Sequence, residues 1–174
     1  MDLQNRNDEV EVYKQIDDFL NYSVSNFGNV RNNRTGRILK PDIRSGYYYI
    51  CLFTNNEKYK KYIHKLVAHT FLNNLENKKC IDHINSDKLD NSLFNLRYAT
   101  HQENSRNAKI SSKNTSGVKG VIFSKKSNKW RAIITIDYKR FHLGYFDDLE
   151  EAKIVRQNKA KEIFKTFLNV CETL

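Results

Sequence analysis

The clearest alternation of hydrophobic and polar positions lies in the last third of the chain. Residues 130–136 place apolar side chains on one face of an extended segment, namely Trp130, Ala132, Ile134 and Ile136. The opposite face begins with Arg131, which is the pattern of a strand buried on one side. Shorter strands are expected on either side of this segment, over residues 119–124 and 140–143.

A helix should follow these strands. Asp148 precedes Glu151 by three residues, in a sequence that resembles a capping box. The apolar positions expected on the buried side of this helix are Leu149, Ala152, Val155, Ile163 and Phe167. The pattern therefore predicts a three-stranded antiparallel sheet packed on one helix, with Trp130 toward the helix and Arg131 toward solvent or a ligand.

The first part of the chain is rich in tyrosine and favours short strands joined by turns. The expected strands and turns are two strands around a turn within residues 22–30, a turn at 33–36, a strand at 47–53, a turn at 54–58 and a strand near 59–63. Leu66, Val67 and Phe71 have helical spacing, which predicts a short helix over residues 64–71.

The chain divides at a polar stretch, residues 109–117, that has no apolar periodicity and predicts a linker. A length of 174 residues favours one or two small domains. The predicted fold class is α+β, with a β-rich N-terminal module, a central module, and a C-terminal sheet and helix. The expected boundaries are residues 1–45, 46–108, a linker at 109–116, and 117–174.

The net charge of the chain indicates which kind of partner it binds. The net charge is +10, and the residues after 108 contain fourteen basic and seven acidic side chains, which favours an anionic partner. No apolar run approaches the roughly 18–20 residues of a membrane span, and the acidic, polar N-terminus is unlike a secretory signal. Together with three scattered cysteines and no CxxC motif, this predicts an intracellular protein with no membrane partner.

The stretch from Cys80 to Asn104 carries the candidate chemistry. Asp82 and His83 end a short apolar segment, a polar loop follows, and residues 93–99 are expected to return as a second arm. Thr100 and Glu103 then form a capping box that starts a helix, with Asn104 one turn inside. A hairpin followed by a helix would therefore bring Asp82, His83 and Asn104 together.

Such a cluster suits phosphodiester hydrolysis. A histidine can deprotonate water near neutral pH. A cation is needed to neutralise charge on the pentacovalent phosphate and on the leaving 3′ oxygen. Carboxylate and amide oxygens are hard ligands that match Mg²⁺ or Mn²⁺.

These residues resemble the HNH motif, in the His-Asn-Asn variant of phage and intron homing endonucleases. The matching positions are Asp82, His83, Asn91, residues 95–100 and Asn104, with residues 63–71 resembling the segment that leads into the motif. Residues 22–30 resemble the NUMOD4-like module often joined to these nucleases. Residues 116–121, 129–131 and 143–146 resemble an AP2-like DNA-binding domain.

The resemblance implies a ββα-metal nuclease core that cleaves DNA. His83 would be the general base, Asp82 and Asn104 would hold one divalent ion, and Asn95 would order the hairpin or help to orient His83. Asn104 stands where the family most often has histidine, which favours Mg²⁺ or Mn²⁺ over zinc-like ligation. The expected protein is a homing-type endonuclease of a virus or mobile element, acting on double-stranded DNA as a monomer without a protein partner.

The basic residues expected to contact DNA lie in the C-terminal module. They are Lys119, Lys125, Lys126, Arg131, Arg140 and His142. The arginines would reach base edges if the sheet entered the major groove, and the lysines would meet phosphates. On this division, a chain that ends at Lys109 would keep weak nuclease chemistry and lose site-specific binding.

Several alternatives stay open. Three further histidines, His64, His69 and His101, are either structural or functional, and the structural role is the more common one. One alternative is a non-catalytic DNA-binding regulator with a vestigial nuclease, although intact Asp82, His83, Asn95 and Asn104 argue against decay. A nuclease that acts on RNA, or without sequence preference, is the other alternative.

Overall fold

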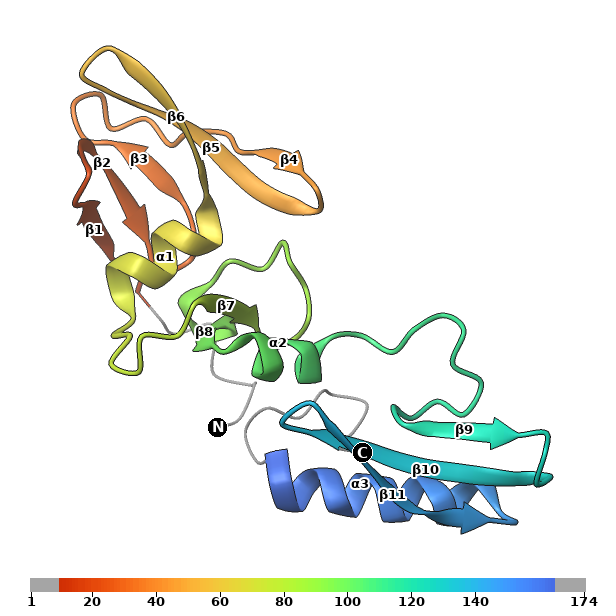
Figure 1. The fold of residues 1–174 in the computed structure, drawn as a ribbon. Helices are drawn as coiled ribbons and strands as arrows, with labels where there is room; N and C mark the ends of the chain where they lie inside the picture. Colours follow the sequence, from red (N-terminus) through yellow and green to blue (C-terminus); the bar gives the residue numbers. More distant parts are fainter. Residues whose placement is uncertain (1–9, 165–174) are drawn as a thin grey trace. The chain divides into compact units, whose positions relative to one another are not determined.

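The computed structural model describes residues 10–164 and has the mixed α+β architecture that the sequence predicts. Phe167, expected on the buried side of the last helix, lies outside the described residues. The chain forms two compact units, Met1–Ala99 and Thr100–Leu174. Both units are drawn in Figure 1. Within residues 10–164, none of the helices has the length and apolar character needed to cross a membrane.

The first unit begins with two small antiparallel sheets (Figure 1). The strands of the first are β1 (Tyr13–Ile16), β2 (Phe19–Ser25) and β3 (Val30–Asn32). Those of the second are β4 (Asp42–Arg44), β5 (Tyr47–Thr54) and β6 (Glu57–Tyr62). The predicted strands and turns are confirmed, whereas β1 and β4 were not expected, because neither carries a regular alternation of buried and exposed positions.

Helix α1 (Ile63–Phe71) follows β6 directly, as the helical spacing predicted. One hydrophobic core joins α1 to both sheets, and its fully buried side chains include Val24, Val30, Leu52 and Val67. This helix contacts β1, β2 and β5, so it ties the two sheets into one body.

A hairpin completes the first unit. Its strands are β7 (Cys80–His83) and β8 (Leu96–Ala99), and a short 3-10 helix, η2 (Leu93–Asn95), leads into the second. The β2–β3 turn supports the hairpin loop, because Leu93 N donates to Asn26 O at 2.7 Å. Gly28 in that turn has φ of +88°, and a Cβ there would lie 3.1 Å from the Cβ of Asn91. The close approach and the positive φ both favour glycine at this position.

The second unit starts with helix α2 (His101–Asn107). Thr100 Oγ1 accepts from Glu103 N and Glu103 Oε2 accepts from Thr100 N, so the predicted capping box is present. Three strands and a helix follow: β9 (Val121–Ser124), β10 (Lys129–Ile136), β11 (Lys139–Phe146) and α3 (Leu149–Phe164). The sheet has the order β11-β10-β9 and is antiparallel, and α3 lies along one face of it (Figure 1).

The C-terminal packing follows the predicted alternation, with one correction on α3. Ala132 and Ile134 are buried toward α3. The buried stripe of α3 consists of Ala152, Arg156, Ala160 and Phe164, and Val155, expected on that side, is only half-buried. An arginine is tolerated there because its Nε donates to Ile133 O at 3.0 Å, which satisfies a carbonyl on the part of β10 that β9 does not pair.

Contacts within the second unit hold α2 in place. Lys119 Nζ donates to Arg106 O at 2.6 Å, and the Arg106 guanidinium lies 4.3 Å from the ring centroid of Phe164. Asn107 is buried. Residues 100–108, expected at the end of the nuclease module, thus belong to the compact unit that also contains the C-terminal sheet.

Candidate active site

His83 is the last residue of β7 and is buried, with 5% of its surface exposed. Its ring lies among other rings, with centroid distances of 5.3 Å to His64 and 6.0 Å to Tyr47. Its Nε2 lies 3.3 Å from Oδ1 of Asn91. The imidazole is therefore held on several sides before any substrate arrives.

The contact with Asn91 selects one tautomer of His83. Asn91 Nδ2 donates to Leu89 O at 3.2 Å, which turns Oδ1 toward the imidazole. A carbonyl oxygen only accepts, so Nε2 carries the proton and Nδ1 is the basic nitrogen. Burial lowers the pKa of His83, while the hydrogen bond to Asn91 and the charge of Asp82 oppose that shift. The neutral form, which a general base requires, is favoured near neutral pH.

Asp82 is also buried and is paired across the hairpin with Arg97, the residue opposite it in the β7–β8 register. Arg97 Nε and Nη2 both lie 2.8 Å from Asp82 Oδ2. A buried carboxylate is stable when it is paired and hydrogen-bonded in this way. The pair fixes the carboxylate next to His83.

Asn95 holds the loop between the hairpin arms. It is 1% exposed, its Oδ1 accepts from Asn85 N at 2.9 Å, and its Nδ2 donates to Asp90 O at 2.8 Å. Both contacts are to loop backbone, in keeping with the hairpin-ordering role that was one of the two expected. The contact that orients His83 comes from Asn91.

Asn104 lies on α2, in the second unit, whereas Asp82 lies in the first. The pairing of these two oxygen donors at one metal ion therefore stays a prediction. Among residues 10–164, no group of three His, Cys, Asp or Glu side chains could hold a metal ion. A site with one carboxylate and one amide would still suit Mg²⁺ or Mn²⁺, which bind few protein oxygens and keep several waters.

Two residues of this site had no role assigned from the sequence. Asn91 and Arg97 fell within the segment that resembles the HNH motif, but their partners depend on the hairpin register. His64, which the sequence left as either structural or functional, is also part of this site. It is 7% exposed, and its ring centroid lies 5.0 Å from that of Tyr47 and 5.7 Å from that of Tyr62. Burial, and to a lesser degree the charge of His83, lowers the pKa of His64 to about 4.

The other two histidines differ from His64 in their exposure. His69 is exposed on α1, and its ring stacks on that of Tyr98 at a centroid distance of 6.3 Å. His101 is exposed in the first turn of α2. Burial thus separates His64, which packs against the imidazole of His83, from the other two.

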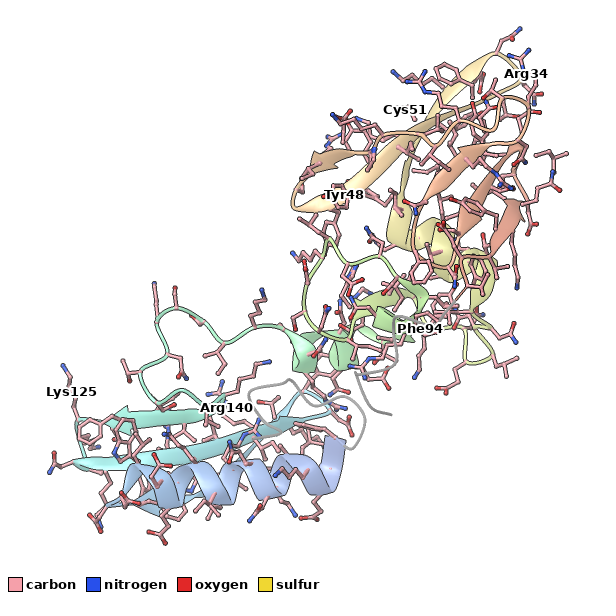
Figure 2. All side chains as sticks on the ribbon, turned by 180° about the vertical axis from the view of Figure 1, so that it is seen from behind. Arg34, Tyr48, Cys51, Phe94, Lys125 and Arg140 are labelled. Atoms are coloured by element: carbon pink, nitrogen blue, oxygen red, sulfur yellow. The ribbon has the colours of Figure 1, made fainter. Side chains whose placement is uncertain are left out.

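Five of the six residues expected to contact DNA fall into two groups, one on the sheet face and one in a turn, and Lys119 stands apart from both. The sheet face opposite α3 carries Arg131, Arg140 and His142, which pair in register with Tyr145, Thr135 and Ile133. Lys125 and Lys126 are exposed in the β9–β10 turn. Lys125 and Arg140 lie toward opposite ends of the sheet (Figure 2). Lys119 differs from the other lysines because its ammonium group is bonded to α2.

Two family models match the chain. Residues 11–53 match the NUMOD4 motif, and residues 61–106 match the HNH endonuclease family. Both resemblances drawn from the sequence are thereby confirmed, while the AP2-like character of the C-terminal module stays a prediction. The HNH match covers β7, β8 and α2, and so includes Asp82, His83, Asn95 and Asn104.

The chain is similar to curated proteins of viruses and phages. The uncharacterized HNH endonucleases L247 and L245 of Acanthamoeba polyphaga mimivirus are 43% and 32% identical, over 62% and 94% of this chain. The chain spans only 28% and 46% of their lengths. DNA endonuclease I-HmuI of Bacillus phage SP01 is 36% identical over 49% of this chain and 50% of its own length.

A solved structure is also similar. It is that of the HNH homing endonuclease I-HmuI, determined in a study of its DNA binding and cleavage. The TM-score is 0.52 at 27% sequence identity, and the match covers 87% of this chain and 82% of that one. The likeness therefore extends beyond the HNH segment to most of the described fold.

Proposed function

Because the chain carries a NUMOD4 motif followed by an HNH endonuclease domain, we propose that it is a metal-dependent, homing-type DNA endonuclease that hydrolyses phosphodiester bonds. The observation that carries this proposal is the setting of His83, which is buried, has its pKa lowered by that burial, and has its Nε2 3.3 Å from Oδ1 of Asn91. A positioned base of this kind typically contributes a factor of about 10² to 10⁴ in rate.

In the proposed reaction, Nδ1 of His83 takes a proton from a water molecule. The resulting hydroxide attacks the phosphorus of the scissile phosphodiester, and the bond to the leaving 3′ oxygen breaks. His64 and Tyr47 confine the imidazole, and Asn91 keeps the proton on Nε2. Asn95 acts at a distance from the reacting atoms, through the loop that carries Asn91.

Asp82 and Asn104 would hold the divalent ion, Mg²⁺ or Mn²⁺. When bound, the ion would neutralise charge on the phosphate and on the leaving oxygen. Arg97 sets the direction of the Asp82 carboxylate. The proposed substrate is double-stranded DNA, read through the open face of the C-terminal sheet by Arg131 and Arg140. The phage and mimivirus relatives support an origin in a virus or mobile element.

Incubation with plasmid DNA tests the proposal. We expect nicked or linear product with Mg²⁺ or Mn²⁺ and none with EDTA, and the same preparation of His83→Ala should be inactive. Cleavage that persists in EDTA would exclude the metal mechanism. DNA binding without cleavage under every metal condition would favour the regulator with a vestigial nuclease, and cleavage of RNA but not DNA would favour an RNA nuclease.

A further inference from the structure

The second unit contains a cavity of about 390 Å³ beside α2, α3 and the free edge of β10. Its basic lining side chains are His101, Arg106, Lys119, Arg140 and Arg156. Among the described residues that line it there is no Asp or Glu. His83, by contrast, belongs to the first unit.

Arg106 is fixed in this cavity with little compensation of its charge. Its guanidinium stacks on the Phe164 ring at 4.3 Å, and within the described residues its buried Nε has no hydrogen-bond partner. The carboxylate paired with it is that of Asp137, at 3.9 Å and with 80% of its side chain exposed. An exposed carboxylate at this distance contributes little.

Two neighbouring basic side chains at the cavity donate hydrogen bonds to backbone carbonyls. Lys119 Nζ donates to Arg106 O, and Arg156 Nε donates to Ile133 O. These carbonyls orient the two side chains. The guanidinium of Arg106, whose paired carboxylate is exposed, would therefore gain from an anion bound beside it in the cavity.

We propose that this cavity binds a backbone phosphate of DNA. The inference rests on the DNA-binding function proposed above and adds a site to it. A guanidinium group matches phosphate oxygens in shape and charge. Arg140 belongs both to the cavity and to the open face of the sheet, so a duplex lying on that face would bring its backbone to the cavity.

The test compares three variants of the full chain by fluorescence anisotropy with a labelled duplex of random sequence. EDTA prevents cleavage, and NaCl is varied from about 50 to 200 mM, the range over which phosphate contacts weaken. Arg106→Met keeps an apolar stem on Phe164 and removes the charge. Arg106→Lys keeps the charge. Lys159→Met is the matched control, because Lys159 is paired with Glu162 on α3 and does not line the cavity.

Arg106→Met should weaken binding about 3–10-fold near 100 mM salt and reduce the salt slope by about one. Arg106→Lys should keep the wild-type slope, and Lys159→Met should keep both affinity and slope. Circular dichroism melting confirms that each variant is folded. An unchanged slope in Arg106→Met, or an equal loss in Lys159→Met, would overturn the phosphate site.

A result that refutes the proposed nuclease activity can be told apart from one that refutes the phosphate site. A wild-type protein that binds DNA but cuts none with Mg²⁺ or Mn²⁺ would remove the proposed catalysis and leave the cavity result standing. Conversely, an Arg106→Met protein that cleaves and binds like the wild type would overturn the cavity alone.

Discussion

Asp82 and Asn104, the two proposed metal ligands, are held by two different kinds of structure. Asp82 lies on a strand whose opposite residue, Arg97, forms an ion pair with its carboxylate. The neighbouring His83 packs against the buried ring of His64 and the half-buried ring of Tyr47. Asn104 lies on a seven-residue helix. A helix that short is not stable alone in water, so its position depends on the contacts of Arg106 with Lys119 and Phe164.

The two compact units therefore have different proposed roles in cleavage. The first unit contains the proposed base and the residues that orient it. The second unit contains the other proposed metal ligand together with the surface proposed to bind DNA. Binding of DNA by the second unit would then act on the same body that carries Asn104, and cleavage would depend on both units even though the base lies in one.

The largest expected effect concerns the base. His83→Ala should lower the cleavage rate by about 10²- to 10⁴-fold, because it removes the proposed general base, with little change in DNA affinity. Asn91→Leu should lower it less, since the base remains but its tautomer is no longer selected. Plasmid cleavage kinetics measure both, and a wild-type rate in His83→Ala would show that the base is misassigned.

The second prediction separates the two halves of the metal site. Asn104→Ala should lower cleavage by about 10²-fold or more, since an ion contributes several kcal/mol to the transition state. A chain that ends at Lys109 should be as inactive, because it lacks Lys119 and Phe164 and leaves α2 without its contacts. This changes the expectation drawn from the sequence, that such a chain would keep weak nuclease chemistry.

The control for that experiment is folding of the first unit, which has its own core. Circular dichroism should show a cooperative melt for the shortened chain. If the shortened chain cleaves plasmid at an appreciable rate, α2 is held by contacts other than those of the second unit, and the comparison between the two halves fails.

The third prediction uses the buried histidine of the first unit. The pKa of His64 is lowered from its ordinary value of 6.5 to about 4. Below pH 6.5 the unfolded chain binds a proton at His64 that the folded chain does not bind until about pH 4. Stability therefore falls as the pH falls through this window, by at most about 3 kcal/mol.

Urea unfolding at pH 7.5 and at pH 4.5 measures this effect. His64→Phe should reduce the difference between the two pH values, because the titrating group is gone. His69→Phe is the matched control, since His69 lies exposed on the same helix. An equal pH dependence in the wild type and in His64→Phe would show that His64 is not held neutral by the fold.

The features that the sequence predicted well are local ones. The alternation of residues 130–136 and the capping box of Thr100 and Glu103 depend on neighbours within a few positions, and both are present in the structure. The same holds for the helix over residues 64–71. Hydrophobic period and cap spacing are set by backbone geometry, so they can be recognised without knowing the fold.

The features that could not be predicted depend on distant partners. Arg97 meets Asp82 because the hairpin register places them opposite each other, fifteen positions apart. Arg156 is buried because a carbonyl twenty-three residues earlier has no strand partner. On sequence alone, an arginine in the middle of a helix predicts an exposed position. Such roles follow from the register and packing of the whole unit.

The fourth prediction concerns base recognition in the second unit. Arg131 lies on the open sheet face opposite Tyr145. If its guanidinium reaches a guanine, Arg131→Ala should lose about 1–3 kcal/mol of discrimination between the preferred site and a site with one changed base pair. Competition binding with the two duplexes measures this difference. Equal losses on both duplexes would show that Arg131 contacts phosphate and carries no sequence information.

The smallest expected effect belongs to Lys126, and it sharpens the contrast with Arg131. Lys126 is exposed in the β9–β10 turn, where a flexible ammonium group can follow a phosphate without reading a base. Lys126→Ala should weaken binding to preferred and random duplexes alike and reduce the salt slope by about one. The cleavage rate at saturating DNA should stay the same, because the turn is remote in sequence from α2 and from the base. A change in the ratio of affinities for the two duplexes would place Lys126 at a base edge, and the division of the second unit into reading and anchoring residues would then have to be redrawn.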